Sequence, residues 1–307
     1  MRRRNDDNKS KKPGFRTPVI CVGGLLAGGV GKTPIVRAIA ARLSVPVIMR
    51  GYGAKCNHGE LDFTSAVGEP VEEVGDEAKM LADSGAEVYV GNRASIIDWL
   101  SQIYSGLRSK IRPCAIVMDD GFQNPTLKKD ISILVFDAKI GVGNGFCLPA
   151  GPMRELLGYG IKRADAIMVI GVYSDKNPNI ERIIRIADLY KKPVFYAKNI
   201  QNTGKLKRRL FAFAGIGYPE KFFAGLRENG HILAGTASYP DHHFYSRAEL
   251  ESMIKSAADA RAELVATEKD WVKIPVDLQK KIKFAPLETD IEPEFWKWID
   301  AQLKRIK

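Results

Sequence analysis

A glycine-rich stretch near the start of the chain carries the residue types that bind phosphate. Residues 21–34 read CVGGLLAGGVGKTP and directly follow a short apolar run. A phosphate cradle needs small residues, so that backbone N–H groups can turn toward the anion, together with a lysine for the outer phosphates and a hydroxyl for Mg²⁺. Three glycines supply the turn, Lys32 supplies the charge and Thr33 the hydroxyl. The stretch predicts a P-loop.

One position departs from the strict P-loop pattern G-x-x-x-x-G-K-[ST]. The first glycine should stand five residues before Gly31, where this chain has Leu26. Because glycines remain where the loop is tightest, we predict that it still holds nucleotide phosphates; a glycine-rich turn without a ligand is the alternative. The predicted nucleotide-binding residues are Ala27, Gly28, Gly29, Val30, Gly31, Lys32, Thr33 and Pro34.

Two carboxylates follow another apolar run and could serve a metal bound at the P-loop. Residues 115–118 read AIVM and lead directly into Asp119 and Asp120. P-loop enzymes hold Mg²⁺ with help from a carboxylate at a neighbouring strand end. We therefore predict Asp119 as the magnesium partner, with Asp120 assisting or orienting. A turn formed by Asp-Asp-Gly without a function is the alternative.

An aspartate and a pair of histidines are candidates for proton transfer. Asp76 stands at the predicted start of a helix, where capping that helix is its simplest role. Asp241 precedes His242 and His243, and an aspartate can orient a histidine and keep it basic enough to accept a proton. Taken alone, each spot favours a structural role. The spacing of the two histidines matches no metal-ligand set.

Alternating apolar runs and helical patterns must position these residues. The runs predict strands separated by amphipathic helices, and this alternation is typical of a mainly parallel sheet covered on both faces. We predict a P-loop NTPase-type α/β fold with a second, smaller α/β domain. The predicted strands are 17–22, 46–49, 87–90, 115–118, 132–136, 166–170, 193–196, 210–214, 263–266 and 281–285; the predicted helices are 34–43, 76–83, 94–104, 219–229 and 246–260.

The chain length and a basic stretch set the expected domain limits. At 307 residues the chain exceeds the ~250–300 at which one hydrophobic core stops growing. After KLKRR at 205–209 the strand–helix pattern begins again. We predict a basic tail over residues 1–16, a P-loop domain over 17–204 and a smaller α/β domain over 205–307.

The composition restricts the class of protein and of partner. With 45% apolar and 27% charged residues the chain is typical of a globular protein, and its formal net charge of +11 favours acidic partners. The four cysteines are far apart and predict neither a zinc cage nor a disulfide framework, so we expect a reducing, cytosolic compartment. No apolar window has the length of a membrane span.

Several motifs together resemble those of one family, the tetraacyldisaccharide 4'-kinases of lipid A synthesis. The resemblance runs through nearly the whole chain in the same order, and DDGFQ, LPAGPMRE and TEKD are far more specific than a P-loop alone. The matching segments are VGG with GGVGKTP (22–34), RGYG (50–53), GDEAKML (75–81), GNR (91–93), DDGFQ (119–123), LPAGPMRE (148–155), FAGIGYPEKFF (213–223), DHHF (241–244) and TEKD (267–270).

The resemblance implies an activity and a set of cofactors. Members of this family transfer the γ-phosphate of ATP, with Mg²⁺, to the 4'-hydroxyl of an acylated glucosamine disaccharide 1-phosphate, and lipid IVA is the product. The nucleotide and the metal are expected in the larger domain and the DHH segment in the smaller one, with the site between them.

The resemblance also implies roles for individual residues. Asp76 and a DHH histidine match an acid–base dyad; we assign His242, with His243 as the alternative. Lys32 and Thr33 match the family's ATP-phosphate and Mg²⁺ positions, and Asp119 and Asp120 match its acidic metal-site pair. Arg154 and Glu155 match two further site residues, of which Arg154 is expected to contact phosphate and Glu155 the metal.

Two features depart from the family pattern. Gly24 stands where the family usually has asparagine, and a basic tail stands where members usually have an apolar or amphipathic helical segment. Either the start of the chain is mis-assigned or truncated, or attachment relies on charge, because basic residues are attracted to anionic lipid. We expect a monomer bound peripherally to the anionic cytoplasmic face of the bacterial inner membrane, with a soluble form as the alternative.

Two other classes of protein share a P-loop. A nucleotide switch would bind a protein partner and give DHHF and LPAGPMRE no role in a site. A nucleic-acid-associated ATPase would agree with the net charge, but the chain has no basic motif interleaved with aromatic residues, so we expect no nucleic-acid partner. The later motifs favour the kinase.

Overall fold

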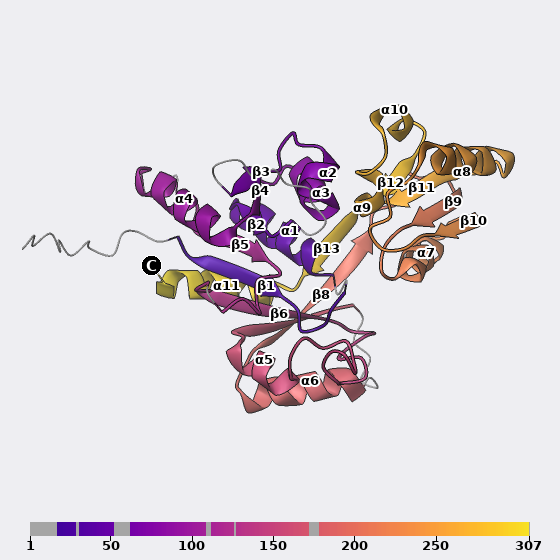
Figure 1. The fold of residues 1–307 in the computed structure, drawn as a ribbon. Coiled ribbons are helices and arrows are strands. Elements are labelled where there is room, and N and C mark those ends of the chain that lie inside the picture. Colours follow the sequence, from indigo (N-terminus) through magenta and orange to yellow (C-terminus); the bar gives the residue numbers. More distant parts are fainter. Residues whose placement is uncertain are drawn as a thin grey trace, which may run out of the picture.

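The computed structural model contains two β-sheets (Figure 1) and describes residues 17–28, 31–51, 62–108, 112–125, 127–171 and 178–306. The basic tail expected at residues 1–16 lies outside these ranges. In spatial order, the strands of the larger sheet are β13 (Leu287–Ile291), β8 (Val194–Gln201), β7 (Ala166–Ile170), β6 (Ile131–Asp137), β1 (Val19–Gly23), β5 (Ile116–Asp119), β2 (Val47–Met49), β4 (Val88–Gly91) and β3 (Phe63–Ser65).

The larger sheet is parallel except at its edges, where β13 and β3 run antiparallel to their neighbours. Its central strand β1 pairs in parallel with β5 and β6. This arrangement confirms the predicted mainly parallel α/β class. The helices are α1 (Lys32–Leu43), α2 (Val71–Val74), α3 (Asp76–Asp83), α4 (Arg93–Ser105), α5 (Leu157–Arg163), α6 (Pro178–Leu189), α7 (Pro219–Glu228), α8 (Arg247–Asp259), α9 (Glu268–Trp271), α10 (Val276–Gln279) and α11 (Pro293–Ile306).

The strands of the larger sheet are apolar because both of its faces are covered. Ile20 and Val22 of β1 belong to a core cluster with α1, α3 and α11, whereas Val19 and Cys21 belong to a cluster with α4, α5 and α6. Successive side chains of a strand point to opposite faces, so a strand buried on both sides has no polar alternation. The polar ends of the strands are therefore the places left for chemistry.

The smaller sheet lies beside the larger one and is parallel throughout (Figure 1). Helix α7 packs on one of its faces through Phe222, Phe223 and Leu226, and α8 packs on the other through Leu250 and Met253. In spatial order its strands are β10 (Ile232–Ser238), β9 (Arg209–Ala214), β11 (Glu263–Thr267) and β12 (Lys283–Ala285).

The end of the chain returns to the larger sheet, which corrects the expected limit of the smaller domain. Strand β13 pairs with β8, and α11 buries Phe295, Ile299 and Leu303 in the core of the larger sheet. The expected range 205–307 assigned this whole segment to the smaller unit. The apolar spacing of α11 indicates a helix that must be covered, but it does not say which sheet covers it.

The ion pairs of Arg37 and Lys221 are among those that join the two parts of the molecule. Arg37 of α1 donates two hydrogen bonds to the Glu268 carboxylate at 2.8 and 2.9 Å, and it also contacts the Leu287 carbonyl. Lys221 of α7 lies 2.5 Å from the buried Asp137 carboxylate at the end of β6. These contacts bring α9 and the smaller sheet toward the polar end of the larger sheet.

No helix within the described ranges combines the length and the apolar character needed to cross a bilayer.

Candidate active site

The predicted P-loop connects β1 to α1, the arrangement expected of a phosphate-binding loop. Gly28 and Gly31 have φ values of 110° and 78°, which L side chains rarely adopt. A Cβ at Gly31 would also lie 3.2 Å from Ile170 Cδ1. Pro34 lies in the first turn of α1, where a missing N–H costs no helical hydrogen bond. Gly29 and Val30 lie outside the described residues.

The fold explains why Leu26 replaces the first glycine of the pattern. Its side chain is 2% exposed and belongs to the core cluster that also contains Met153. Leu26 and Met153 form an isolated β-bridge, and the Ala27 N–H donates to the Pro152 carbonyl at 2.8 Å. The start of the loop is thus attached to the LPAGPMRE segment.

Two cations meet at Asp120, next to the P-loop. Lys32 Nζ lies 3.5 Å from Asp120 Oδ1, and Arg154 donates to both oxygens of the same carboxylate at 2.8 and 3.0 Å. Burial alone would raise the pKa of Asp120, but Lys32 and Arg154 outweigh it and hold the pKa below its usual range. The result is a carboxylate flanked by two positive groups, a setting in which phosphate oxygens compete well for the cations.

Asp119 is buried beside the P-loop hydroxyl. The Thr33 hydroxyl donates to Asp119 Oδ2 at 3.3 Å, while Oδ1 has no hydrogen-bond partner among the described residues. Burial and the nearby Glu77 raise the pKa of Asp119 to about 7, against the opposing effect of Lys32. A buried carboxylate with an unsatisfied oxygen beside a hydroxyl fits Mg²⁺, which prefers oxygen ligands and keeps several from water and substrate phosphates.

The raised pKa of Asp119 predicts how the stability of the metal-free protein depends on pH. Between pH 4 and 7 the folded state retains a proton that the unfolded state, with an ordinary carboxyl pKa, releases. The stabilisation linked to that proton is therefore lost as pH rises toward about 7. In chelator, the wild type should lose more Tm than Asp119→Asn between pH 4.5 and 7.5, on the order of a few degrees. Parallel Tm profiles would contradict this assignment.

Glu155 lies next to Arg154 in sequence but has a different partner. Arg163 Nη2 donates to both Glu155 oxygens at 2.5 and 2.6 Å, and Gln123 donates to Oε1 at 3.2 Å. In the part of the chain that the structure describes, no three His, Cys, Asp or Glu side chains lie close enough to hold a metal. The structure thus groups Thr33 with Asp119 and pairs Glu155 with Arg163.

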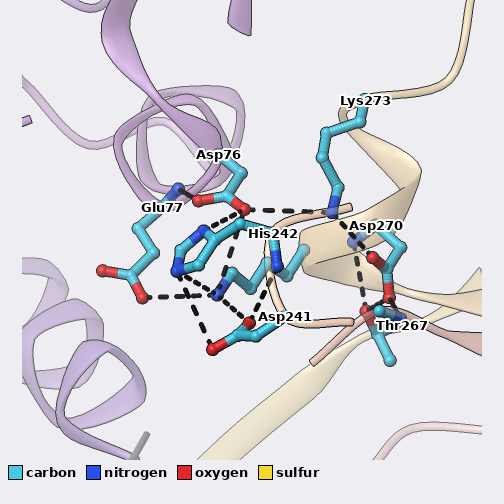
Figure 2. Close-up of polar contacts among 9 residues, drawn as sticks. Asp76, Glu77, Asp241, His242, Thr267, Asp270 and Lys273 are labelled. Atoms are coloured by element: carbon cyan, nitrogen blue, oxygen red, sulfur yellow. Dashed lines mark hydrogen bonds and ion pairs between the residues drawn. The ribbon is translucent and has the colours of Figure 1, made fainter. Parts of the chain in front are cut away.

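Asp76 and His242 meet across the two parts of the molecule, although 166 residues separate them (Figure 2). Asp76 begins α3 and is 5% exposed, and its Oδ2 lies 2.9 Å from His242 Nδ1. The Glu77 N–H donates to the other oxygen at 2.9 Å. His242 has φ 62°, a conformation that is rare outside glycine and common at functional positions. A small pocket is lined by both side chains and by Met49.

The neighbouring histidine has different surroundings. His243 lies 3.2 Å from Glu249 Oε1, and its ring stacks on Tyr239 with centroids 4.7 Å apart. Tyr245 contacts the same ring edge-on. These contacts place His243 among the side chains of the smaller domain, so of the two alternatives His242 is the one that reaches Asp76.

Lys269 is the group that the sequence did not single out. It belongs to TEKD, and its ammonium lies 3.3 Å from His242 Nε2 and 3.0 Å from Asp241 Oδ1. Burial would lower the pKa of Lys269, but the carboxylates of Asp76, Glu77 and Asp241 prevail and raise it, so the ammonium is charged. In the sequence, the TEKD motif was the signal that could have indicated Lys269, because a lysine between two acidic residues has no characteristic pattern of its own.

A second lysine supports the same cluster from within the core. The Lys273 side chain is fully buried, and its ammonium lies 2.8 Å from Asp270 Oδ1 and 3.9 Å from Asp76 Oδ2 (Figure 2). Asp270 in turn accepts hydrogen bonds from the Gly215 N–H and the Thr267 hydroxyl. This buried network fixes α9, and hence Lys269, against the start of α3.

Known proteins resemble this chain along most of its length. The family model described as Tetraacyldisaccharide-1-P 4'-kinase matches residues 1–304. The chain is 38% identical over 272 residues to the tetraacyldisaccharide 4'-kinase of Methylobacterium radiotolerans, covering 86% of this chain and 79% of the relative. It is 36% identical over 285 residues to that of Paramagnetospirillum magneticum, covering 89% and 82%.

A solved structure supports the same relationship. LpxK from Aquifex aeolicus, crystallised in complex with ATP, superposes with a TM-score of 0.69 at 25% identity and covers 94% of this chain and 88% of its own. The motifs, the two-sheet fold and the relatives agree along nearly the whole length. The chain therefore belongs to the tetraacyldisaccharide-1-P 4'-kinase family.

Proposed function

We propose that this chain transfers the γ-phosphate of ATP to the 4'-hydroxyl of a tetraacyl glucosamine disaccharide 1-phosphate, giving lipid IVA. ATP and Mg²⁺ are its cofactors. The observation that carries the proposal is the pairing of Asp76 with His242 at 2.9 Å, with Glu77 of the same helix turn close enough to Asp119 to raise its pKa. The helix turn that carries this proton acceptor is thus within electrostatic reach of Asp119, which accepts a hydrogen bond from the Thr33 hydroxyl.

At the nucleotide end, positive charge and positioning are the main requirements of phosphoryl transfer. Lys32 and Arg154 would exchange their contacts with Asp120 for contacts with phosphate oxygens. Thr33, Asp119 and Asp120 would hold Mg²⁺, which when bound neutralises charge on the phosphates. Glu155 would join the metal site only if its pair with Arg163 opened. The loop from Ala27 to Pro34 would surround the phosphates.

At the acceptor end, the contacts of His242 assign its tautomer. A charged lysine only donates hydrogen bonds, so Lys269 makes Nε2 of His242 an acceptor and leaves the proton on Nδ1. Nδ1–H then donates to Asp76, which stays an anionic acceptor. Asp76 is accordingly the group that takes the proton of the sugar hydroxyl, and His242 orients it.

Lys269→Met tests this assignment. Without the ammonium, Nε2 is no longer held as an acceptor and Asp76 loses a nearby positive charge, so we expect the transfer rate to fall about 10-fold or more with unchanged Mg·ATP affinity. Single-turnover transfer and nucleotide titration measure the two quantities. Lys255→Met, on the exposed face of α8, is the matched control. Equal loss in both variants would contradict the role.

The proposed site needs one chain only, since the P-loop, Asp76 and His242 all come from the same molecule. We therefore propose a monomer. Its acceptor is a lipid, which supports a peripheral location on the anionic cytoplasmic face of the inner membrane.

The reaction is tested by mass spectrometry of the lipid. Purified protein is incubated with Mg·ATP and the acylated disaccharide 1-phosphate in detergent micelles, beside a Lys32→Ala control. A gain of one phosphate that depends on Lys32 is expected. ATP turnover without any gain in lipid mass, stimulated by a protein or a polynucleotide, would favour the nucleotide switch or the nucleic-acid ATPase.

A further inference from the structure

Exposed apolar side chains concentrate on one short segment. Among the described residues, thirteen large apolar side chains are exposed, and four of them fall between residues 146 and 159. Single exposed apolar residues are ordinary, but a group of them indicates an interaction surface. The four are Phe146 at 63% exposure, Leu148 at 58%, Leu156 at 56% and Tyr159 at 68%; we refer to them as the 146–159 surface.

Backbone contacts fold the loop that carries Phe146 and Leu148 back toward the start of α5. The Leu148 N–H donates to the Met153 carbonyl at 2.8 Å, and the Met153 N–H donates to the Phe146 carbonyl at 3.1 Å, so the loop folds back toward α5. Leu156 precedes α5 directly, and Tyr159 stands one turn further along the same side. Three other residues of the same segment, Met153, Leu157 and Ile161, are buried in the core. The segment is anchored on one side and presents apolar groups on the other.

The charge around this surface is positive. Residues 139–163 contain four basic residues and a single acidic one, Glu155, which is paired with Arg163. Lys139 and Lys162 are exposed. Arg182 of α6 is exposed as well, and its Nη1 lies 3.0 Å from the place where a Cβ of Gly145 would stand; its neighbour Glu181 is acidic. Apolar and aromatic side chains rimmed by cations are typical of surfaces that lie on anionic lipid.

The segment is also joined to the site. Arg154, which reaches Asp120 beside the P-loop, follows Met153, and its N–H donates to the Leu25 carbonyl at 2.6 Å. A bilayer in contact with the 146–159 surface would therefore lie next to the phosphate-binding end of the molecule. An amphipathic acceptor would then meet the site without leaving the interface.

We propose that the 146–159 surface docks this protein on the surface of an anionic bilayer. Phe146, Leu148, Leu156 and Tyr159 enter the boundary between headgroups and acyl chains, while Lys139, Lys162 and Arg182 contact lipid phosphates. The proposal rests on the proposed function only in so far as the acceptor is a membrane lipid, and it concerns binding, not turnover.

The experiment is co-sedimentation of the full chain with vesicles of phosphatidylethanolamine and phosphatidylglycerol, beside vesicles of phosphatidylcholine. Phe146→Ser/Leu148→Ser is compared with the control Val67→Ser/Val276→Ser, which removes exposed apolar residues elsewhere. We expect the first pair to weaken partition to anionic vesicles at least 10-fold and the control pair to change it less than twofold. The wild type should bind the neutral vesicles at least 10-fold more weakly.

Thermal melts of each variant report folding separately from binding. Equal partition of the two paired variants, or equal binding of the wild type to both vesicle types, would overturn the proposal. A change from dimer to monomer in Phe146→Ser/Leu148→Ser, measured by light scattering with vesicle binding intact, would also overturn it and assign the surface to a second copy of the chain. None of these readouts needs transfer activity, so a failed kinase assay leaves them interpretable.

Discussion

The Asp76→Asn variant is expected to bind Mg·ATP like the wild type and to transfer phosphate about 10²–10⁴-fold more slowly. The amide keeps the size of the carboxylate, but it cannot accept the proton that the sugar hydroxyl must lose. Asp76 is 5% exposed and contacts His242 at 2.9 Å, so few other groups can replace it. Single-turnover transfer to the glycolipid measures the rate, and nucleotide titration measures binding.

The double variant Asp76→Asn/His242→Ala tests whether the two residues act together. Residues that act as a unit show non-additive losses, so His242→Ala in the Asp76→Asn background should cost little beyond the single substitution. His243→Ala provides the matched control, because that ring packs against Tyr239 and Glu249 and does not reach Asp76. Fully additive losses for Asp76 and His242, or a parallel loss of ATP affinity in both, would remove them as an acid–base pair.

The second large effect is expected at the P-loop lysine. Lys32→Ala removes a positive charge at the place where charge develops on the phosphates, and it leaves Asp120 with Arg154 as its cationic partner. We expect kcat/KM for ATP to fall about 10²–10³-fold, the usual cost of losing one group that stabilises a developing anion. Steady-state kinetics with ATP varied at saturating glycolipid measure it.

A fold measurement must accompany this variant, since the partly buried Asp120 carboxylate loses one of its two cationic partners. Lys32→Ala/Asp120→Ala removes both charges and should recover Tm without recovering turnover. Turnover within a few-fold of the wild type in Lys32→Ala would refute the P-loop assignment.

Much of the fold could be predicted because strands that are buried on both faces have a clear sequence pattern. Strands covered on both faces, such as β1 and β7, are continuous apolar runs. Strand β10 (Ile232–Ser238), which the sequence did not predict, is half exposed at a sheet edge and contains glycine and alanine, so it lacks a continuous apolar run. β13 (Leu287–Ile291) was missed for the same reason, since its polar residues alternate on an edge strand.

Some residues of the candidate site could also be predicted from the sequence, and others could not. Local motifs indicated the P-loop, Asp119 and Asp120, because each lies in a short run of consecutive residues with a recognisable pattern. Lys269 and the pairing of Glu155 with Arg163 had no local signal. A salt bridge forms only where the tertiary structure brings two elements together. The residues next to either partner in the sequence do not specify that arrangement.

By itself, the sequence determined the family and the mainly parallel fold, and it predicted phosphate binding by the loop that ends in Lys32 and Thr33, because these depend on local residue types and on a characteristic order of motifs. Only the tertiary structure decided that His242, and not His243, meets Asp76, and that α11 returns to the larger sheet. Both outcomes depend on contacts between segments that lie far apart in the sequence. Packing of that kind is a long-range property, and the periodicity of any single element leaves it open.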